Sequence, residues 1–354
     1  MMILSGNPPR GKLLTGLVVL VVGLLALAPF LFPGSKPLNV AAKICVYALL
    51  VASYDLLLGY AGIVSFAHTM FYGVGAYGVA IALHALGASW FAVFAGLGAA
   101  LAVAGALALL IGLFSLRVQT IFFAMVTLAV ASAFAVLASQ LSWLTGGEDG
   151  RTFSVPQALR PGFQLIDSGA FGGAANGRTL AYYLVFGVAA VLFLALLRIV
   201  ESPFGRVLQA IRENPFRAEA LGYRIVVHRT AANVLAALFA ACAGALNALW
   251  LRYTGPDTTL SFSIMLDILV MVVIGGMGTL YGAIVGAAVF VLAQNYLQAL
   301  MGVAFGAINK AGLPLVAGFL NPDRWLLWLG VLFILSVYFF PTGVVGRLRA
   351  DPKP

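Results

Sequence analysis

The sequence predicts an all-helical integral membrane protein, a polytopic bundle of about ten transmembrane helices with one charged loop between them. Two observations carry this prediction. The 354 residues are 62% hydrophobic and only 9% charged, with a mean hydropathy of +1.05. A soluble domain is about 25% charged, so this chain has too little charge to cover a water-facing surface. The apolar stretches are also continuous and about 20 residues long, which is the helix length that crosses a bilayer core, whereas the strands of a membrane barrel would alternate between apolar and polar residues.

Ten apolar runs are the candidate spans. In chain order they are Leu13–Phe32, Leu38–Leu58, Ser65–Leu86, Phe91–Leu116, Thr120–Leu141, Leu180–Val200, Thr230–Leu251, Ile264–Leu280, Gly282–Leu300 and Trp325–Pro341. The first run could also be a signal peptide, because Ala26-Leu27-Ala28 resembles a cleavage site. The proline that follows and the many later spans favour a retained helix.

Clustered basic residues predict the orientation of the bundle. Lys and Arg gather in the head before Leu13, in the stretch Glu201–Arg229 and in the tail after Val345, so all three are expected in the cytoplasm. Six predicted spans separate the head from the charged stretch, and four separate that stretch from the tail. Both numbers are even, so both termini are predicted to be cytoplasmic. The gap Gly59–Val64 could instead be a helix break or a re-entrant turn, and a re-entrant turn would change this parity.

Patterns that would indicate nucleotide or metal chemistry are incomplete. Residues 6–12, GNPPRGK, fit G-x-x-x-x-G-K, but Leu13 stands where a P-loop needs Ser or Thr. His68 and Asp55 do not make a zinc site, which needs three or four ligands. The sequence therefore predicts no catalytic residue, no metal and no cofactor in this chain. The net charge of +9 is interpreted as loop charge, and nucleic acid is not expected as a partner.

The stretch Glu201–Arg229 is predicted to form two short amphipathic helices joined at a corner. Ser202 before a proline, and Asn214 before another, are N-cap signals, and Gly222 is a typical residue just beyond a helix. The predicted helices are Pro203–Glu213 and Pro215–Leu221; the first has an apolar face of Phe204, Val207, Leu208 and Ile211 and an opposite face of Arg206, Gln209, Arg212 and Glu213. The pattern alone fits a surface resting on lipid headgroups and a surface docking on a partner protein equally well.

Three segments spread through the chain share a resemblance. They are DLLLGYAGIVSFAHTMFYGVGAY at 55–77, GRVLQAIRENPFRAEALGY at 205–223, which contains Glu219-Ala220-Leu221-Gly222, and VVIGGMGTLYGAIVG at 272–286. Together they resemble the permease subunits of the branched-chain amino acid ABC importers. The resemblance covers nearly the whole chain and implies a single permease domain over residues 1–354, with residues 201–229 as its cytoplasmic coupling loop.

The resemblance also implies partners. They are a second, similar permease subunit, two ATP-binding cassette subunits that bind the ATP, an extracytoplasmic substrate-binding protein and the lipid of a bacterial inner membrane. The residues then expected to couple to the ATPase are Pro203, Phe204, Gly205, Arg206, Arg212, Glu213, Asn214, Pro215, Glu219, Ala220 and Gly222.

Polar residues inside the spans are candidates for the translocation path. Ser65, His68, Thr69 and Tyr72 are predicted to share one helical face, and Asn233 and Asn247 belong to a small and polar stripe. Polar groups at membrane depth face a cavity or another helix, so an interhelical hydrogen bond is the alternative for each of them.

Glycines in the second half predict a site of close helix packing. Gly278, Gly282 and Gly286 recur every four residues and are expected along one side of a helix, where a neighbour can approach closely. Gly275-Gly276 just before them invites a bend or break.

The resemblance thus implies a permease that carries branched-chain or related hydrophobic amino acids and catalyses no covalent chemistry. Within the ABC class, a permease for urea or short amides is the alternative. A secondary transporter driven by ions is a further one, for which Asp55 and Asp267 offer the carboxylates. The sequence leaves open the exact substrate and whether the permease pairs with itself or with a different chain.

Overall fold

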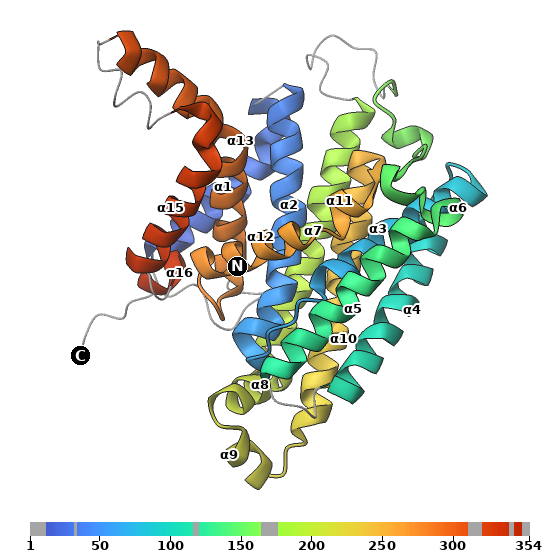
Figure 1. The fold of residues 1–354 in the computed structure, drawn as a ribbon, viewed down its shortest axis with the longest axis vertical. Helices are drawn as coiled ribbons and strands as arrows, with labels where there is room; N and C mark the ends of the chain where they lie inside the picture. Colours follow the sequence, from blue (N-terminus) through green and yellow to red (C-terminus); the bar gives the residue numbers. More distant parts are fainter. Residues whose placement is uncertain are drawn as a thin grey trace.

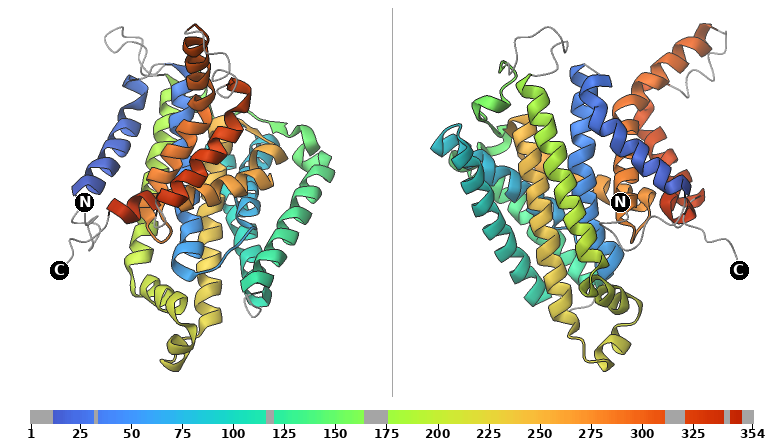
Figure 2. Two further views of the ribbon diagram at one scale, coloured as in Figure 1. Left: turned by 60° about the vertical axis from the view of Figure 1, so that its left-hand side comes forward. Right: turned by 180° about the vertical axis from the view of Figure 1, so that it is seen from behind.

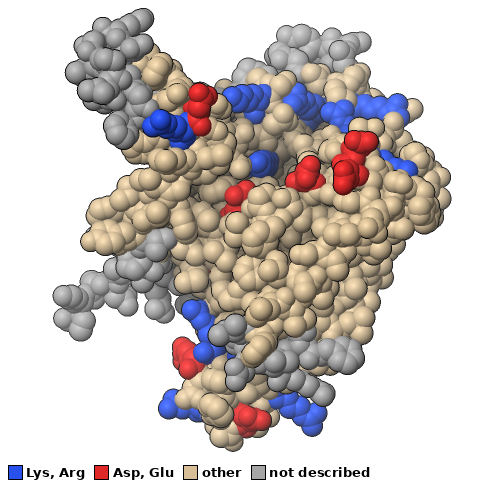
Figure 3. Space-filling model, in the orientation of Figure 1, with Lys and Arg blue, Asp and Glu red and all other residues tan. Residues whose placement is uncertain are grey.

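The computed structural model describes residues 12–31, 34–115, 120–163, 176–310, 321–339 and 343–348. Within them, nine helical segments are long and apolar enough to cross a membrane, which confirms the predicted polytopic helical bundle. Figure 3 shows the corresponding surface, with charged atoms near the two ends of the visible face and a broad uncharged belt between them. The molecule is therefore built for a bilayer around its middle.

The first half of the chain supplies five long helices. They are α1 (Lys12–Leu31), α2 (Ser35–Asp55), α3 (His68–Leu86), α4 (Trp90–Ser115) and α5 (Thr120–Gln140), and a π-helix, η1 (Leu56–Ala61), continues α2. Helix α2 runs through the middle of the bundle (Figure 1) and packs against helices of the second half. Every residue from Val40 to Asp55 is buried except Lys43. That lysine is the one interruption in this enclosed stretch of the helix.

Short elements lead into the second half, and its long helices follow. The short ones are α6 (Ser142–Thr145), η2 (Gly147–Asp149), β1 (Arg151–Thr152) and η3 (Gln157–Leu159). After them come α7 (Gly177–Glu201), α8 (Pro203–Glu213), α9 (Pro215–Ala220), α10 (Ile225–Leu251), β2 (Tyr253–Thr254), α11 (Pro256–Thr259), α12 (Phe262–Gly275), α13 (Leu280–Lys310), η4 (Pro322–Arg324), α15 (Trp325–Phe339) and α16 (Gly343–Leu348). Strand β1 pairs antiparallel with β2, and this ties the segment after α5 to the end of α10.

Small residues let α10 pack closely on α3. A side chain at Gly75 of α3 would collide with the backbone of Ala241, and one at Gly244 of α10 would collide with the carbonyl of Tyr72. Without a hydrophobic force between helices in lipid, such close backbone approach is a principal source of helix association. Helices α3, α4 and α10 form one closely packed group beside α2.

Glycine changes the predicted course of the chain between α12 and α13. The predicted span Ile264–Leu280 ends early, because α12 stops at Gly275 and the next helix begins at Leu280. Gly276 and Gly278 have φ of 113° and 78°, which favours glycine and interrupts a helix. The prediction that Gly278 shares one helix with Gly282 and Gly286 is therefore wrong.

Two other predicted boundaries also shift. Helix α3 begins at His68, so Ser65 precedes it and does not share its face as predicted. In the predicted tenth span, α15 has 15 residues, short of the roughly 20 that cross a bilayer, and Pro341 lies outside the described residues. Six of the nine candidate spans precede α8, as the sequence predicts. In the basic head that supports the predicted orientation, Lys12 begins α1 and Arg10 lies outside the described residues.

Candidate functional site

Helix α9 projects beyond the ends of the long helices, and α8 lies at the same end of the bundle, as the ribbon views show (Figures 1 and 2). Helix α8 spans Pro203–Glu213 as predicted, and α9 ends at Ala220, one residue earlier than predicted. The side chain of Asn214 caps α9 by accepting a hydrogen bond from the Arg217 amide at 3.0 Å. Gly222 has the left-handed backbone, with φ of 91°, expected of a residue just beyond a helix. We call α8 and α9 together the coupling segment.

The apolar face of α8 fixes this helix to the bundle. Leu208 and Ile211 are buried, and Phe204 and Val207 are half-buried, as the sequence pattern predicts. Gly205 lies so close to the carbonyl of Val200 that a larger residue would collide with the end of α7. Movement of α8 would therefore carry the end of α7 with it.

Helix α9 and the turn after it present apolar side chains outward. Phe216 is 83% exposed and Leu221 is 71% exposed at the projecting end of the coupling segment. Neither was among the predicted coupling residues, although an aromatic residue within a charged helix is a signal that could have identified Phe216. The predicted coupling residues that are also exposed are Pro203, Arg206, Arg212, Glu213, Asn214, Glu219, Ala220 and Gly222, whereas Pro215 is half-buried.

Arg212 reaches back from α8 into the bundle, although its position is exposed. Its guanidinium donates a hydrogen bond to the carbonyl of Gly59 in η1. The backbone of Gly59 also contacts Gly278, since a Cβ at either position would meet the other residue. The amide of Gly278 in turn donates to Oδ1 of the buried Asp55 at 2.8 Å. We call Asp55, Gly59, Arg212 and Gly278 the glycine junction; it joins α8 to the π-helix η1 and to the break between α12 and α13.

A polar cavity of about 450 Å³ lies among α2, α10, α11, α12 and α13. It is lined by Lys36, Asn39, Val40, Lys43, Tyr47, Asn247, Trp250, Leu251, Asp257, Thr258, Ser263, Ile264, Asp267, Gln294 and Asn295. Helix α2 contributes Lys36, Lys43 and Tyr47 from one face, at helical spacing. Such polar groups on membrane-length helices usually mark a pathway or a binding site.

Three side chains in the polar cavity form a chain of contacts. The Lys43 ammonium donates to Oε1 of Gln294 at 2.8 Å, and Nε2 of Gln294 lies 3.5 Å from Oδ2 of Asp267. The ammonium also lies 5.3 Å from the centre of the Tyr47 ring. Asp267 is therefore linked to a cation through an amide, whereas the sequence offered it only as a carboxylate for an ion-driven transporter.

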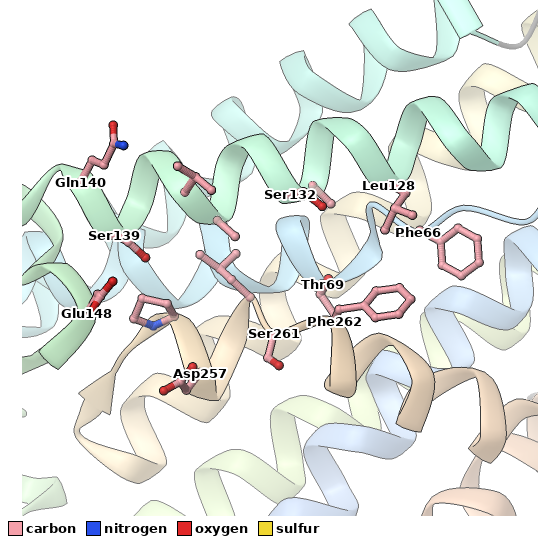
Figure 4. A pocket seen from close by; sticks show the side chains of 15 residues that line it. Phe66, Thr69, Leu128, Ser132, Ser139, Gln140, Glu148, Asp257, Ser261 and Phe262 are labelled. Atoms are coloured by element: carbon pink, nitrogen blue, oxygen red, sulfur yellow. The ribbon is translucent and has the colours of Figure 1, made fainter.

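A second cavity, of about 460 Å³, lies between α5 and the segment that contains α11 and the start of α12. Figure 4 shows Ser132 and Ser139 of α5 on one side, with Asp257 and Ser261 on the other. We call it the α5 cavity. Asp257 lines both cavities, so α11 stands between them.

The predicted path residues divide into two groups. Thr69 lines the α5 cavity, and Asn247 lines the polar cavity. The other four are buried in side-chain packing: Ser65, His68, Tyr72 and Asn233. Within that group, Nε2 of His68 lies 2.8 Å from the hydroxyl of Ser53, and the amide of Asn233 donates to the Ala108 carbonyl at 2.8 Å.

The remaining predicted glycines pack α13 against α12. A side chain at Gly282 would collide with the backbone of Gly275, and one at Gly286 with the carbonyl of Met271. In the part of the chain that the structure describes, no three His, Cys, Asp or Glu residues gather as a metal site would require.

The architecture and the cavities define a multi-pass membrane protein with polar space between its helices. Residues 36–337 match the family described as the permease component of branched-chain amino acid transport systems. The chain belongs to this family and is thus a transport component, not an enzyme. Such a component works within a system of several subunits, which implies partner subunits.

Curated relatives carry related names. The chain is 26% identical over 364 aligned residues to the high-affinity branched-chain amino acid transport system permease protein LivM of Salmonella typhimurium, with 99% of this chain and 78% of that protein covered. The values for LivM of Escherichia coli are the same. A probable branched-chain amino acid transport permease protein LivM of Methanocaldococcus jannaschii is 28% identical over 181 residues, covering 49% of this chain and 48% of that protein. No solved structure gives a significant match.

Proposed function

We propose that this chain forms part of the translocation path of an ATP-driven importer for branched-chain or related hydrophobic amino acids. Its partners would be a second permease subunit, two ATP-binding subunits and an extracytoplasmic substrate-binding protein, in a bacterial inner membrane. The ATP would be bound by the partners, and this chain would hold no cofactor. Family membership and the names of the relatives support this proposal.

One observation carries the coupling part of the proposal: Phe216 and Leu221 are exposed at the end of a projecting segment. An exposed apolar pair rimmed by polar residues is typical of a protein interaction site. Arg217 and Glu219 of α9 are exposed beside them. This surface would dock on an ATP-binding subunit, and the coupling segment and both chain termini would lie in the cytoplasm.

The glycine junction supplies a route from the docked segment to the membrane. Arg212 of α8 holds Gly59 in η1, the π-helix that continues α2, and Asp55 holds Gly278 in the break after α12. A shift of α8 driven by ATP would therefore act on α2 and on the α12–α13 turn together. Helices α2, α12 and α13 line the polar cavity further along the bundle, so its access would change with the shift.

Reconstitution of the complete importer in proteoliposomes tests the transport activity. With binding protein outside and ATP inside, we expect leucine to accumulate and urea not to accumulate. A collapsed ion gradient should leave leucine uptake intact. Uptake that survives without ATP but needs a sodium or proton gradient would overturn the proposal, and ATP-driven uptake of urea alone would replace its substrate class.

The docking surface is tested by the double substitution Phe216→Ala and Leu221→Ala. Truncating two central apolar contacts typically weakens an interface by about 2 kcal/mol or more, so the ATP-binding subunits should no longer co-purify with the permease. The chain should melt at an unchanged temperature, because both side chains are already exposed. Val303→Ala is the matched control, since Val303 is 75% exposed on α13, away from the coupling segment. Co-purification that survives the double substitution would contradict docking at this tip.

A further inference from the structure

Lys43 and Asp267 place opposite charges inside the polar cavity, on two membrane-length segments. Lys43 lies eight residues into α2, about 12 Å along the helix from its start. Asp267 lies on α12, which faces α2 and α13. Charged side chains at such positions are costly in a membrane and are usually retained for function. Neither residue is used by the docking surface or by the glycine junction.

Gln294 of α13 joins the two charges by a neutral group. Its carbonyl oxygen accepts from the Lys43 ammonium at 2.8 Å, while its amide nitrogen is 3.5 Å from the Asp267 carboxylate. The contact with Lys43 is a good hydrogen bond, and the contact with Asp267 is at the long limit. Gln294 thus offers each charge the kind of group that a ligand could replace: an oxygen acceptor for the lysine and an N–H donor for the aspartate.

A free α-amino acid carries both of these groups, with full charge and on neighbouring atoms. Its carboxylate would accept from Lys43, and its ammonium would donate to Asp267. Charge-assisted hydrogen bonds of this kind are about twice as strong as neutral ones, so the ligand would compete well with the amide of Gln294. Asn247 also lines this space and could satisfy a remaining carboxylate oxygen.

The other walls of the polar cavity suit an aliphatic side chain. Val40, Ile264, Trp250 and Leu251 bring apolar surface from three helices to the same space as the charges. The volume of about 450 Å³ is in the range of small-molecule sites. The α5 cavity differs, since its two carboxylates, Glu148 and Asp257, come without a cation among the lining residues.

We propose that Lys43, Asp267 and Gln294 form a binding site for the charged head of a hydrophobic α-amino acid on its way through the permease. The proposal rests on the proposed transport function and deepens it, because it gives the permease a substrate site of its own besides that of the binding protein. The competing interpretation is purely structural: the three side chains would only clamp α2, α12 and α13 together.

Protection of an introduced cysteine separates these interpretations. The importer is assembled from both permease subunits and the ATP-binding subunits, without the binding protein. Cys45 and Cys242 of this chain are replaced by alanine. Ser263→Cys then places a thiol on the exposed rim of the polar cavity. The rate of modification by a charged thiol reagent is measured against increasing leucine, leucinamide and 4-methylpentanoate. The two analogues lack the carboxylate and the ammonium, respectively. Ser132→Cys in the α5 cavity is the matched control.

We expect leucine to slow modification at position 263 and not at position 132, and both analogues to protect poorly. Lys43→Met and Asp267→Asn should each raise the half-protecting leucine concentration about tenfold, as expected for a lost hydrogen bond to a charged group. Leucine protection that is as strong in both variants as in the chain with Lys43 and Asp267 intact, or protection at position 132 alone, would overturn the site. So would absence of protection at 263 in an importer that takes up leucine.

An uptake measurement on the same preparation distinguishes a wrong binding site from a wrong proposed function. ATP-driven leucine uptake is measured with binding protein added to the cysteine-substituted importer and to the unsubstituted chain. Leucine uptake without protection at position 263 would refute the binding site but would still support the transport function. Absence of uptake in the unsubstituted importer refutes the transport function, on which the site rests.

Discussion

The glycine junction and the polar cavity lie along the same central helix, yet they are built in opposite ways. At the junction, Gly59 and Gly278 meet through their backbones; a side chain at Gly59 would collide with Gly278, and one at Gly278 would be strained by its φ of 78°. In the cavity, Lys43 and Asp267 stand apart in about 450 Å³ of space. The first region is defined by the lack of room and the second by the presence of it.

This difference indicates that the junction would transmit a movement of the coupling segment, whereas the cavity would bind a solute. Close backbone contact transmits a shift without loss, because packed atoms can neither compress nor slide far before they clash. A cavity with separated charges can accept a ligand, because its side chains can exchange partners. Added atoms should therefore harm the junction, whereas removed charges should harm the cavity.

The largest expected effect is that of Gly59→Ala at the junction. The new methyl group would collide with the Asp55 carboxylate and with the backbone of Gly278. Overpacking of this kind costs about 1–3 kcal/mol, and more where the obstacle is backbone. We expect a lower melting temperature of the purified chain and loss of leucine uptake.

Gly98→Ala in α4 is the control for this substitution. A Cβ there meets no atom within 4 Å, and alanine favours a helix over glycine by up to about 1 kcal/mol. Melting and uptake should be unchanged or slightly improved. If Gly59→Ala behaves like Gly98→Ala, the junction is not close-packed, and the contrast between the two regions fails.

Arg212→Met should separate coupling from assembly. Its guanidinium holds the Gly59 carbonyl, while the docking residues Phe216 and Leu221 remain in place. We expect the ATP-binding subunits still to co-purify, but the leucine moved per ATP hydrolysed to fall about fivefold or more, in the range of typical coupling energies. Arg224→Met, at an exposed position just before α10, is the control. An unchanged transport ratio in Arg212→Met would show that the shift travels by another route.

The coupling segment could be predicted well from the sequence because its signals are local. The Ser-Pro and Asn-Pro cap patterns and the apolar face at Leu208 and Ile211 depend on neighbouring residues only, and α8 has the predicted bounds. The contact of Arg212 with Gly59 joins residues 153 positions apart. No local pattern contains such a contact, so the sequence placed Arg212 on the polar face and among the coupling residues but gave it no partner in the bundle.

The polar cavity was missed for a related reason, although part of its signal was present. Lys43 is a lysine inside the apolar run Leu38–Leu58, and such a residue is by default a functional candidate. Its partners Gln294 and Asp267 come from helices more than 220 positions later. The break at Gly276–Gly278 was invited by the paired glycines, but its conformation depends on the positive φ that only tertiary packing fixes.

The smallest expected effects distinguish two asparagines that the sequence placed on one stripe of α10. Asn233→Ala removes an amide that donates to the Ala108 carbonyl, and an interhelical bond of this kind contributes about 0.6 kcal/mol in a membrane. It should lower the melting temperature slightly and leave leucine protection at position 263 unchanged. Asn247→Ala should leave the melting temperature unchanged and weaken leucine protection at position 263, because Asn247 lines the polar cavity. One helix would then serve packing at one end and the solute at the other, and equal effects of the two substitutions on protection would contradict that division.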